Sequence, residues 1–233
     1  MSDKAIVVLS GGQDSMTCFA QAYVDCHGDI SAVSFEYGQR HVAEINAAKK
    51  MCEDFKVPHV IVDLSTLLSN GTSALTDTSL EVGKPHPLMP GVPSSFVPMR
   101  NAIFLTAAYG LAMERGANLV YTGVCETDYS GYPDCRMDFA KALHKALTLG
   151  YPVQGEPILF LTPLMYLDKA QTFKMAADLG DVAGITVLDY IIENSVTCYH
   201  GDVTTRHAWG TGCGKCPSCE LKAKGFAEYK MRY

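Results

Sequence analysis

The chain has 233 residues, of which 48% are hydrophobic and 19% charged, so it is long enough for one large globular domain with a small appendage. Its net charge of −6 argues against an extensive nucleic-acid surface, and we expect no stable nucleic-acid partner. No apolar run reaches about 18 residues, which argues against a membrane-spanning helix and a membrane partner. Because no signal-peptide layout precedes the first apolar segment, we expect a cytoplasmic protein whose nine cysteines are thiols or metal ligands.

Short apolar segments alternate with helical patterns from residue 5 to about residue 180. Strands are predicted over residues 5–9, 30–37, 57–62, 118–124 and 158–161. Helical spacing of apolar residues is found over residues 16–23, 42–52, 99–116 and 139–147, and a capping box formed by Asp168 and Gln171 begins a further helix. This alternation predicts an α/β protein with a doubly wound, Rossmann-like parallel sheet.

Three other segments complete the predicted organisation. Residues 64–98 contain several prolines, which exclude a regular helix, and we expect part of this segment to cover the active site. The helix over 99–116 is apolar nearly all round and is expected to be buried. Residues 187–192 are expected to form a short strand or turn. We predict a nucleotide-binding domain over residues 1–192, with a small lobe over 193–233 packed on it.

The first predicted strand runs into the sequence Leu9-Ser10-Gly11-Gly12-Gln13-Asp14-Ser15. Two glycines between a strand and a helix start allow close approach of an anion, and the helix adds free N–H groups. No GK[ST] follows, so this is not a Walker A loop. It resembles instead the SGGxDS loop of the N-type ATP pyrophosphatases, which cleave ATP between its α and β phosphates. The alternative is a glycine-rich turn without a ligand.

Polar segments follow two other strands at the same expected edge of the sheet. Residues 36–39 follow the second strand, beside the phosphate loop, where a nucleotide base could lie. Residues 125–136 follow the fourth strand and are rich in acidic, aromatic and turn residues, as binding loops are. We therefore expect the following residues to contact the nucleotide: Val8, Leu9, Ser10, Gly11, Gly12, Gln13, Asp14, Ser15, Tyr37, Gly38, Gln39 and Gly123.

A cysteine cluster near the carboxyl terminus predicts a metal site. Cys213, Cys216 and Cys219 have C-x2-C-x2-C spacing, and Cys198 lies fifteen positions before Cys213. Four thiolates form a closed tetrahedral zinc site, which is usually structural. Free thiols, a redox pair and an iron–sulfur cluster are the alternatives.

The phosphate loop and the cysteine cluster together resemble the 7-cyano-7-deazaguanine synthase family of queuosine biosynthesis. The resemblance covers most of the chain and includes these segments: residues 35–41, 96–101, 123–136, 162–165, 168–169 and 197–199. One departure is Met99, which stands where the family pattern VPGRN has glycine. The resemblance implies an adenine nucleotide alpha-hydrolase-like fold with a small C-terminal zinc lobe, a homodimer, and ATP, Mg²⁺ and Zn²⁺ as cofactors.

The family resemblance also implies the reaction. The carboxylate of 7-carboxy-7-deazaguanine is adenylated by ATP, ammonia displaces AMP to form an amide, and a second ATP activates the amide so that AMP leaves a nitrile. Asp14 is expected to bring magnesium to the phosphates, and Ser15, Lys169 and Arg100 are the other candidate catalytic groups. The candidates for substrate contacts are Glu126, Asp128, Tyr132, Asp134 and Arg136, because carboxylates suit the N–H edge of a guanine-like ring and arginine suits a carboxylate.

Other functions fit parts of this pattern. The chain could be another adenylating pyrophosphatase, such as an amidotransferase synthetase domain, an amide-forming deazapurine enzyme or an RNA-thiolating enzyme. Thiolation requires reactive cysteines, for which Cys125 and Cys135 are candidates, and a basic RNA surface, which the net charge disfavours. A non-catalytic zinc and nucleotide-binding module would bind ATP without releasing pyrophosphate.

Overall fold

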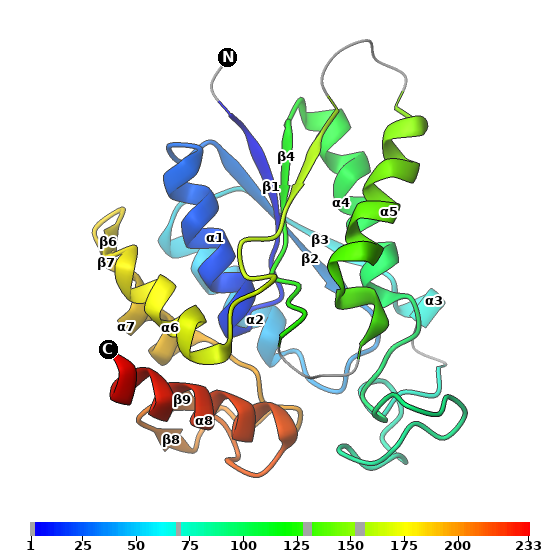
Figure 1. Cartoon of the computed structure of the whole chain (residues 1–233), viewed down its shortest axis with the longest axis vertical. Coiled ribbons are helices and arrows are strands. Elements are labelled where there is room, and N and C mark those ends of the chain that lie inside the picture. Colours follow the sequence, from blue (N-terminus) through cyan, green and yellow to red (C-terminus); the bar gives the residue numbers. More distant parts are fainter. Residues whose placement is uncertain (1–2, 69–70, 128–131, 152–156) are drawn as a thin grey trace.

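A five-stranded parallel sheet forms the centre of the molecule (Figure 1). The computed structural model describes residues 3–68, 71–127, 132–151 and 157–233. The strands are β1 (Ala5–Val8), β2 (Ile30–Glu36), β3 (His59–Asp63), β4 (Leu119–Tyr121) and β5 (Leu159–Leu161), in the spatial order β3-β2-β1-β4-β5. Every neighbouring pair is parallel, which confirms the predicted doubly wound sheet.

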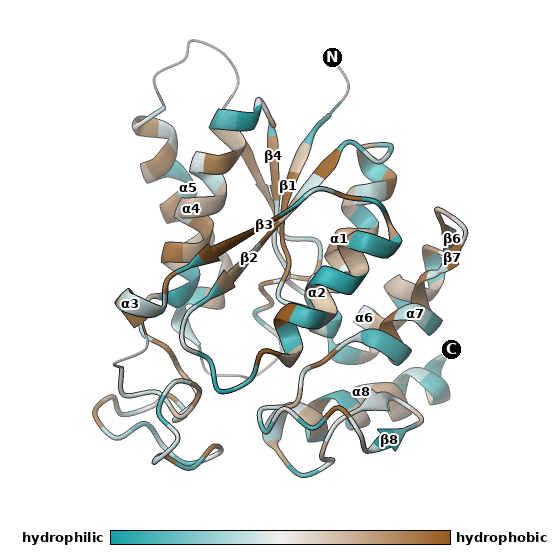
Figure 2. Ribbon diagram, turned by 180° about the vertical axis from the view of Figure 1, so that it is seen from behind, coloured by the Kyte–Doolittle hydropathy of each residue, from teal (hydrophilic) through white to brown (hydrophobic). Residues whose placement is uncertain are grey.

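Helices cover both faces of the sheet because β1 is apolar on both of its faces. Ala5 and Val7 pack toward the side of α1 (Gln13–Asp25) and α2 (Ala43–Asp54). Ile6 packs toward the opposite side, where α4 (Arg100–Arg115) and α5 (Met137–Leu149) lie. Figure 2 shows the strands largely brown between helices whose outer faces carry teal residues. Burial of both faces is typical of a parallel sheet.

The position of the site follows from the order of the strands. The chain leaves β1 through α1 to β2 on one side, but it returns from β3 through α4 to β4 on the other side of β1. The loops after β1 and β4 therefore diverge at the carboxyl edge of the sheet. Such a switch point is where open α/β sheets bind ligands.

A C-terminal lobe packs below α6 (Lys169–Asp178) and α7 (Val187–Asn194) (Figure 1). It consists of the hairpin β8 (Arg206–His207) and β9 (Gly210–Thr211), the cysteine turn and α8 (Pro217–Arg232). Phe173 of α6 and Phe226 of α8 meet edge to face, with ring centroids 5.2 Å apart. A second small hairpin, β6 (Asp181–Val182) and β7 (Ile185–Thr186), joins α6 to α7.

Two expectations from the sequence are wrong. Residues 187–192, predicted as a strand or turn, belong to α7, because Val187 and Ile191 are four residues apart and bury the same helical face. The predicted burial of α4 holds for one face only. Leu105, Ala108 and Ala112 are buried, whereas Thr106 and Gly110 on the opposite face are exposed.

Other expectations are confirmed. The Asp168 carboxylate accepts a hydrogen bond from the Gln171 backbone N–H at 2.8 Å, and the Gln171 side chain accepts one from the Asp168 N–H at 2.8 Å. In its described residues, the segment before α4 contains the helical turn α3 (Ser65–Leu68) and is otherwise irregular. Within the described ranges, none of the helices combines the length and apolarity that a membrane crossing requires.

Candidate functional site

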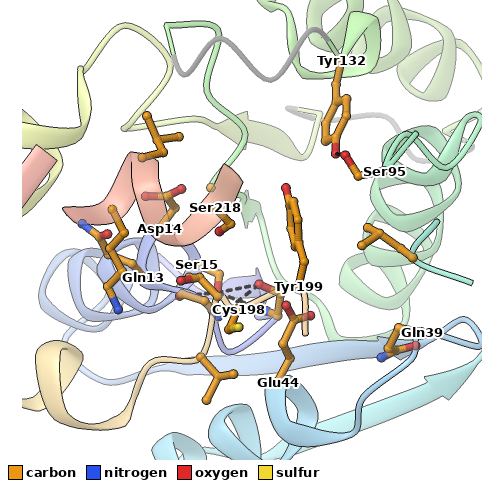
Figure 3. Close-up of a pocket in the computed structure, with 18 of the residues that line it drawn as sticks. Gln13, Asp14, Ser15, Gln39, Glu44, Ser95, Tyr132, Cys198, Tyr199 and Ser218 are labelled. Carbon is orange, nitrogen blue, oxygen red and sulfur yellow. Dashed lines mark hydrogen bonds between the residues drawn. The ribbon is translucent and has the colours of Figure 1, made fainter. Parts of the chain in front are cut away.

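A cavity of about 650 Å³ opens at the carboxyl edge of the sheet. This volume lies within the range of about 300–1,000 Å³ that is typical of small-molecule sites. Its walls come from the loops after β1, β2 and β4, from the first turns of α2 and α4, and from the segment before α4. In Figure 3, Gln13, Asp14 and Ser218 lie at one end of the cavity, and Ser95 and Tyr132 lie at the other. The sequence prediction that the long segment partly covers the site is confirmed, since Leu75 and Ser95 line the cavity.

The phosphate loop closes around the hydroxyl of Ser15. Ser15 Oγ accepts hydrogen bonds from the backbone N–H groups of Ser10 at 3.1 Å and Gly11 at 3.2 Å, and it donates one to the Gly12 carbonyl at 3.0 Å. Gly11 has φ of +91°, and a Cβ there would lie 2.0 Å from the Glu44 carbonyl oxygen. Only glycine fits this position, because the backbone conformation and the contact with α2 both exclude a side chain.

An ion pair lies beside the loop. Lys169 Nζ, at the first residue of α6, donates to the two carboxylate oxygens of Asp14 at 2.9 and 2.8 Å. The Lys169 side chain is 9% exposed and that of Asp14 is 30% exposed. Both residues line the cavity. The structure thus brings together two of the predicted catalytic residues from positions 155 residues apart.

The opposite end of the cavity is aromatic and cationic. The guanidinium carbon of Arg100 lies 5.6 Å from the centre of the Tyr37 ring and 6.0 Å from that of Phe104. Tyr132 Oη donates to Ser95 Oγ at 2.6 Å. Tyr199, which the sequence analysis did not select, also lines this end, and burial raises the pKa of its hydroxyl. A flat, partly apolar ligand with an anionic group would match these surroundings.

Glu44 is the main residue that the sequence analysis missed. It lies in the first turn of α2 and lines the cavity, with Tyr199 beside it in Figure 3. Burial raises the pKa of its carboxyl to about 7, although the charge of Arg100 acts to lower it. Its position a few residues after the polar end of the second strand was the signal in the sequence that could have identified Glu44 as a site residue. A helix that starts at the carboxyl edge of the sheet directs its first turn at the site.

Most residues predicted to contact the nucleotide line the cavity. Those that do so are Val8, Leu9, Ser10, Gly12, Gln13, Asp14, Ser15, Tyr37, Gln39 and Gly123. Gly11 and Gly38 do not, and both have positive φ, of +91° and +78°. A Cβ on Gly123 would lie 3.1 Å from the backbone of Asp14 and Ser15, so the loop after β4 packs closely on the phosphate loop.

Of the residues predicted to contact the second substrate, Tyr132 lines the cavity. Glu126 instead accepts the backbone N–H of Met137 at 3.1 Å, at the start of α5. Asp134 is 5% exposed and accepts the backbone N–H of Asn101 at 3.1 Å, at the start of α4. Arg136 is exposed outside the cavity lining, and Asp128 falls outside the described residues. The two carboxylates are thus placed where helix N-termini attract them.

The four predicted metal ligands are close together. The sulfur atoms of Cys198, Cys213, Cys216 and Cys219 all lie within 4.8 Å of one another, and three of the four residues are buried. Gly214 makes the turn with φ of +69°, and a Cβ on Gly212 would lie 2.7 Å from Cys219 Sγ. This cluster could therefore hold a metal ion, as the spacing predicts.

The lobe that carries the cysteines also forms a wall of the cavity. Ser218 and Lys222 of α8 are lining residues that the sequence analysis did not select. Lys222 is 2% exposed, and burial lowers the pKa of its ammonium group to about 8. The backbone N–H of Val196 donates to the Gly11 carbonyl at 2.9 Å, so the chain just before Cys198 is bonded to the phosphate loop.

Comparison with known proteins identifies relatives along nearly the whole chain. The profile of the family described as Queuosine biosynthesis protein QueC matches residues 4–230. The chain is 42% identical over 230 residues to the 7-cyano-7-deazaguanine synthase of Wolinella succinogenes, covering 98% of this chain and 94% of the relative. It is 45% identical over 230 residues to that of Staphylococcus haemolyticus, covering 97% and 93%.

Likenesses to solved structures are weaker. The NH3-dependent NAD synthetase of Campylobacter jejuni aligns with a TM-score of 0.46 and 17% identity, covering 82% of this chain and 68% of that one. The U34-tRNA thiolase NcsA of Methanococcus maripaludis, solved with its [4Fe-4S] cluster, aligns with a TM-score of 0.42 and 14% identity, covering 98% and 65%.

Proposed function

The chain belongs to the queuosine biosynthesis protein QueC family, the 7-cyano-7-deazaguanine synthases, and from this premise we propose the chemistry of its cavity. The protein is an ATP-dependent ligase that converts 7-carboxy-7-deazaguanine and ammonia to 7-cyano-7-deazaguanine. The assignment of this reaction to the cavity rests on one observation. A single cavity has a phosphate loop with the Asp14–Lys169 pair at one end, and Arg100 and Glu44 among aromatic rings at the other.

The reaction needs two activations because oxide and hydroxide are poor leaving groups. A carboxylate oxygen of the substrate attacks the α-phosphorus of ATP, the bond to the β-phosphate breaks, and pyrophosphate leaves. Ammonia attacks the acyl carbon, loses a proton, and releases AMP to give the amide. The amide oxygen then attacks a second ATP. Loss of the remaining N–H protons and of AMP leaves the carbon–nitrogen triple bond.

The phosphate end of the cavity is suited to the departing pyrophosphate. The backbone N–H groups at the start of α1 supply donors, in a loop that the Ser10 and Ser15 hydroxyls hold closed, and Lys169 supplies a cation. Asp14 keeps 30% of its side chain exposed toward this space, which suits an oxygen ligand of Mg²⁺. Magnesium bound there would neutralise charge on the phosphates.

The aromatic end is suited to the deazapurine. Arg100 is the cation that would pair with the substrate carboxylate and hold it for attack, and the Tyr37 and Phe104 rings hold the guanidinium. Glu44 is the carboxylate that would accept the N–H edge of the guanine-like ring. Glu126 and Asp134 have helix N-termini as partners, so Glu44 takes the role that the sequence analysis gave to them.

We further propose that the four cysteines hold one structural zinc ion. A Zn–S distance of about 2.3 Å places two sulfur atoms of a tetrahedral site roughly 3.8 Å apart. Cys213 Sγ and Cys219 Sγ are 3.9 Å apart, and all four sulfur atoms lie within 4.8 Å of one another. This spacing suits a single ion better than an iron–sulfur cluster, whose several iron atoms separate the thiolates further.

The buried thiols in the cavity disfavour the RNA-thiolation alternative. Burial, together with the nearby Asp134 carboxylate, raises the pKa of Cys135 to about 12, so its thiolate is scarce at neutral pH. The acidic net charge of −6 also disfavours an RNA-binding surface. A cytoplasmic homodimer without a nucleic-acid partner is the setting we propose for the enzyme.

Product analysis tests the proposed function. The protein is incubated with ATP, Mg²⁺, ammonium and 7-carboxy-7-deazaguanine, and the products are identified by mass spectrometry. We expect the nitrile, with AMP and pyrophosphate formed only when the deazapurine is present. An absence of substrate-dependent AMP would refute the ligase assignment, and amide without nitrile would establish the truncated reaction instead.

A further inference from the structure

Lys222 is a buried cation in the cavity that the mechanism above does not use. It is 2% exposed, and its Nζ donates to Ser195 Oγ at 2.8 Å. An ammonium group has three donors, so this bond leaves two of them for other acceptors. The Lys222 Nζ also lies 5.7 Å from the centre of the Trp209 ring, but no carboxylate of the described residues forms a salt bridge with it, although buried lysines are usually paired.

The surroundings of Lys222 are those of the phosphate loop. Asp14 and Lys169 both interact electrostatically with its ammonium group. Cys219 of the metal-binding turn also acts on this ammonium group, so Lys222 lies between the phosphate loop and the cysteine turn. Ser195, which accepts its hydrogen bond, directly precedes Val196, whose backbone N–H bonds the Gly11 carbonyl. An anion bound in the loop would be attracted by Lys169 and Lys222, which both line the cavity.

Two further polar groups in the cavity lack a hydrogen-bond partner among the described residues. Gln13 Nε2 and Thr197 Oγ1 are buried atoms of lining residues, and neither has a hydrogen-bond partner in the described chain. Thr197 lies against the phosphate loop, because a Cβ on Gly12 would be 3.3 Å from its methyl group. A buried donor without a partner is costly, so a bound acceptor at this place would stabilise both groups.

Helix α8 connects Lys222 to the metal-binding turn. Cys216 precedes the helix, Cys219 lies in its first turn, and Lys222 follows Cys219 by three residues, on the same side of the helix. The same helix contacts the other lysine of the site. A Cβ on Gly225 would lie 2.3 Å from Lys169 Cγ, so α8 packs against the stem of Lys169 at a place where only glycine fits.

We propose that Lys222 is a second cation of the phosphate site, which donates to a phosphate oxygen of the nucleotide opposite Lys169, and that the cysteine turn holds it there. The C-terminal lobe is then part of the nucleotide site as well as a structural appendage. This inference rests on the proposed function only in requiring a phosphate ligand in the cavity.

Binding of pyrophosphate in the presence of Mg²⁺, measured by calorimetry, tests the inference on the full chain without any deazapurine. Lys222→Met removes the charge at similar length and should weaken pyrophosphate binding about 10- to 100-fold, the effect of one charge-assisted hydrogen bond. Lys222→Arg should restore most of the affinity. Lys230→Met, on the exposed side of the same helix, is the matched control and should bind as the wild type does.

Folding and metal content are measured for each variant. These controls separate a loss of binding caused by the missing charge from one caused by unfolding or by loss of the metal. If Lys222→Met loses its metal or its fold, Lys222→Gln, which keeps a donor for Ser195, takes its place. A charge-free, folded variant that binds pyrophosphate as tightly as the wild type overturns the inference and leaves the proposed function standing. A wild-type protein that binds neither pyrophosphate nor ATP overturns both.

Discussion

The two ends of the cavity are built in different ways. The phosphate end comes mainly from the contiguous residues Ser10 to Ser15, whose hydrogen bonds run within the loop. The aromatic end gathers Tyr37, Arg100, Tyr132 and Tyr199 from widely separated parts of the chain. An anion site made of backbone N–H groups can thus be encoded in a few consecutive residues, whereas a site for a flat ring needs side chains from several elements.

The largest effect is expected at the phosphate end, from Lys169→Met. It removes the cation paired with Asp14 and should lower the rate of deazapurine-dependent AMP formation about 10²- to 10³-fold, the usual cost of losing one charge-stabilising group. Lys174→Met, on the same helix, removes a surface pair with Asp178 and a contact with the Tyr233 ring, both outside the cavity, and is the control. A rate within threefold of the wild type would contradict the role of Lys169.

Replacement of Gly11 tests whether the loop conformation and its close contact with α2 are needed for stability. In Gly11→Ala, the added Cβ would lie 2.0 Å from the Glu44 carbonyl oxygen, and φ of +91° strains the backbone. We expect a loss of at least about 2 kcal/mol in the free energy of unfolding, measured by urea denaturation. Gly110→Ala, at an exposed position of α4 with open space around its Cβ, should instead leave stability unchanged or raise it.

At the aromatic end, Arg100→Met should affect only one of the two substrates. We expect the KM for 7-carboxy-7-deazaguanine to rise about 10- to 100-fold, because the substrate carboxylate loses its charged partner. Pyrophosphate binding should be unchanged, since Arg100 lies at the other end of the cavity. Arg115→Met, at the far end of the same helix, is the control. An equal loss of pyrophosphate affinity would show that the two ends do not act separately.

Glu44 predicts a dependence of stability on pH. Its pKa is raised to about 7 in the folded protein, so the folded state holds this proton more tightly than the unfolded state does. The stabilisation from the protonated form is therefore present at low pH and is lost as the pH rises from about 4.5 to about 7. Glu44→Gln should remove this dependence.

Urea unfolding at pH 4.5 and pH 8 measures the effect of Glu44→Gln. Relative to the wild type, the free energy of unfolding of the variant should gain about 3 kcal/mol from pH 4.5 to pH 8. Glu53→Gln, an exposed change on the same helix, should show no such gain. Parallel pH profiles of wild type and Glu44→Gln would contradict the raised pKa.

The smallest effect is expected at Met99, the position where the family pattern has glycine. Met99 has φ of +57° and is 53% exposed, so its side chain adds backbone strain and little burial. Met99→Gly should raise the free energy of unfolding by about 0.5 to 1 kcal/mol, whereas Met99→Ala keeps the strained conformation and should not. Thermal denaturation of the two variants measures the difference.

The sheet, the phosphate loop and the cysteine cluster could be predicted from sequence patterns. Buried parallel strands are short and apolar, the SGG turn lies directly between a strand and a helix, and closely spaced cysteines can share one metal ion. Each of these signals is local, because every strand, the phosphate loop and the C-x2-C-x2-C motif is a run of neighbouring residues. The prediction was wrong at residues 187–192, where Val, Tyr and Ile favour a strand but packing against α1 and α6 selected a helix.

Which polar side chains share the cavity depends on the packing of distant segments and could not be predicted from sequence patterns. Glu126 and Asp134 are acidic residues next to a binding loop, yet their carboxylates accept N–H groups at helix starts, whereas Glu44 faces the cavity. Lys222 is brought to the phosphate loop by α8, more than 200 residues after it in sequence. The direction of a side chain depends on how helices pack on the sheet, and that packing is a sum of many contacts between segments far apart in the chain.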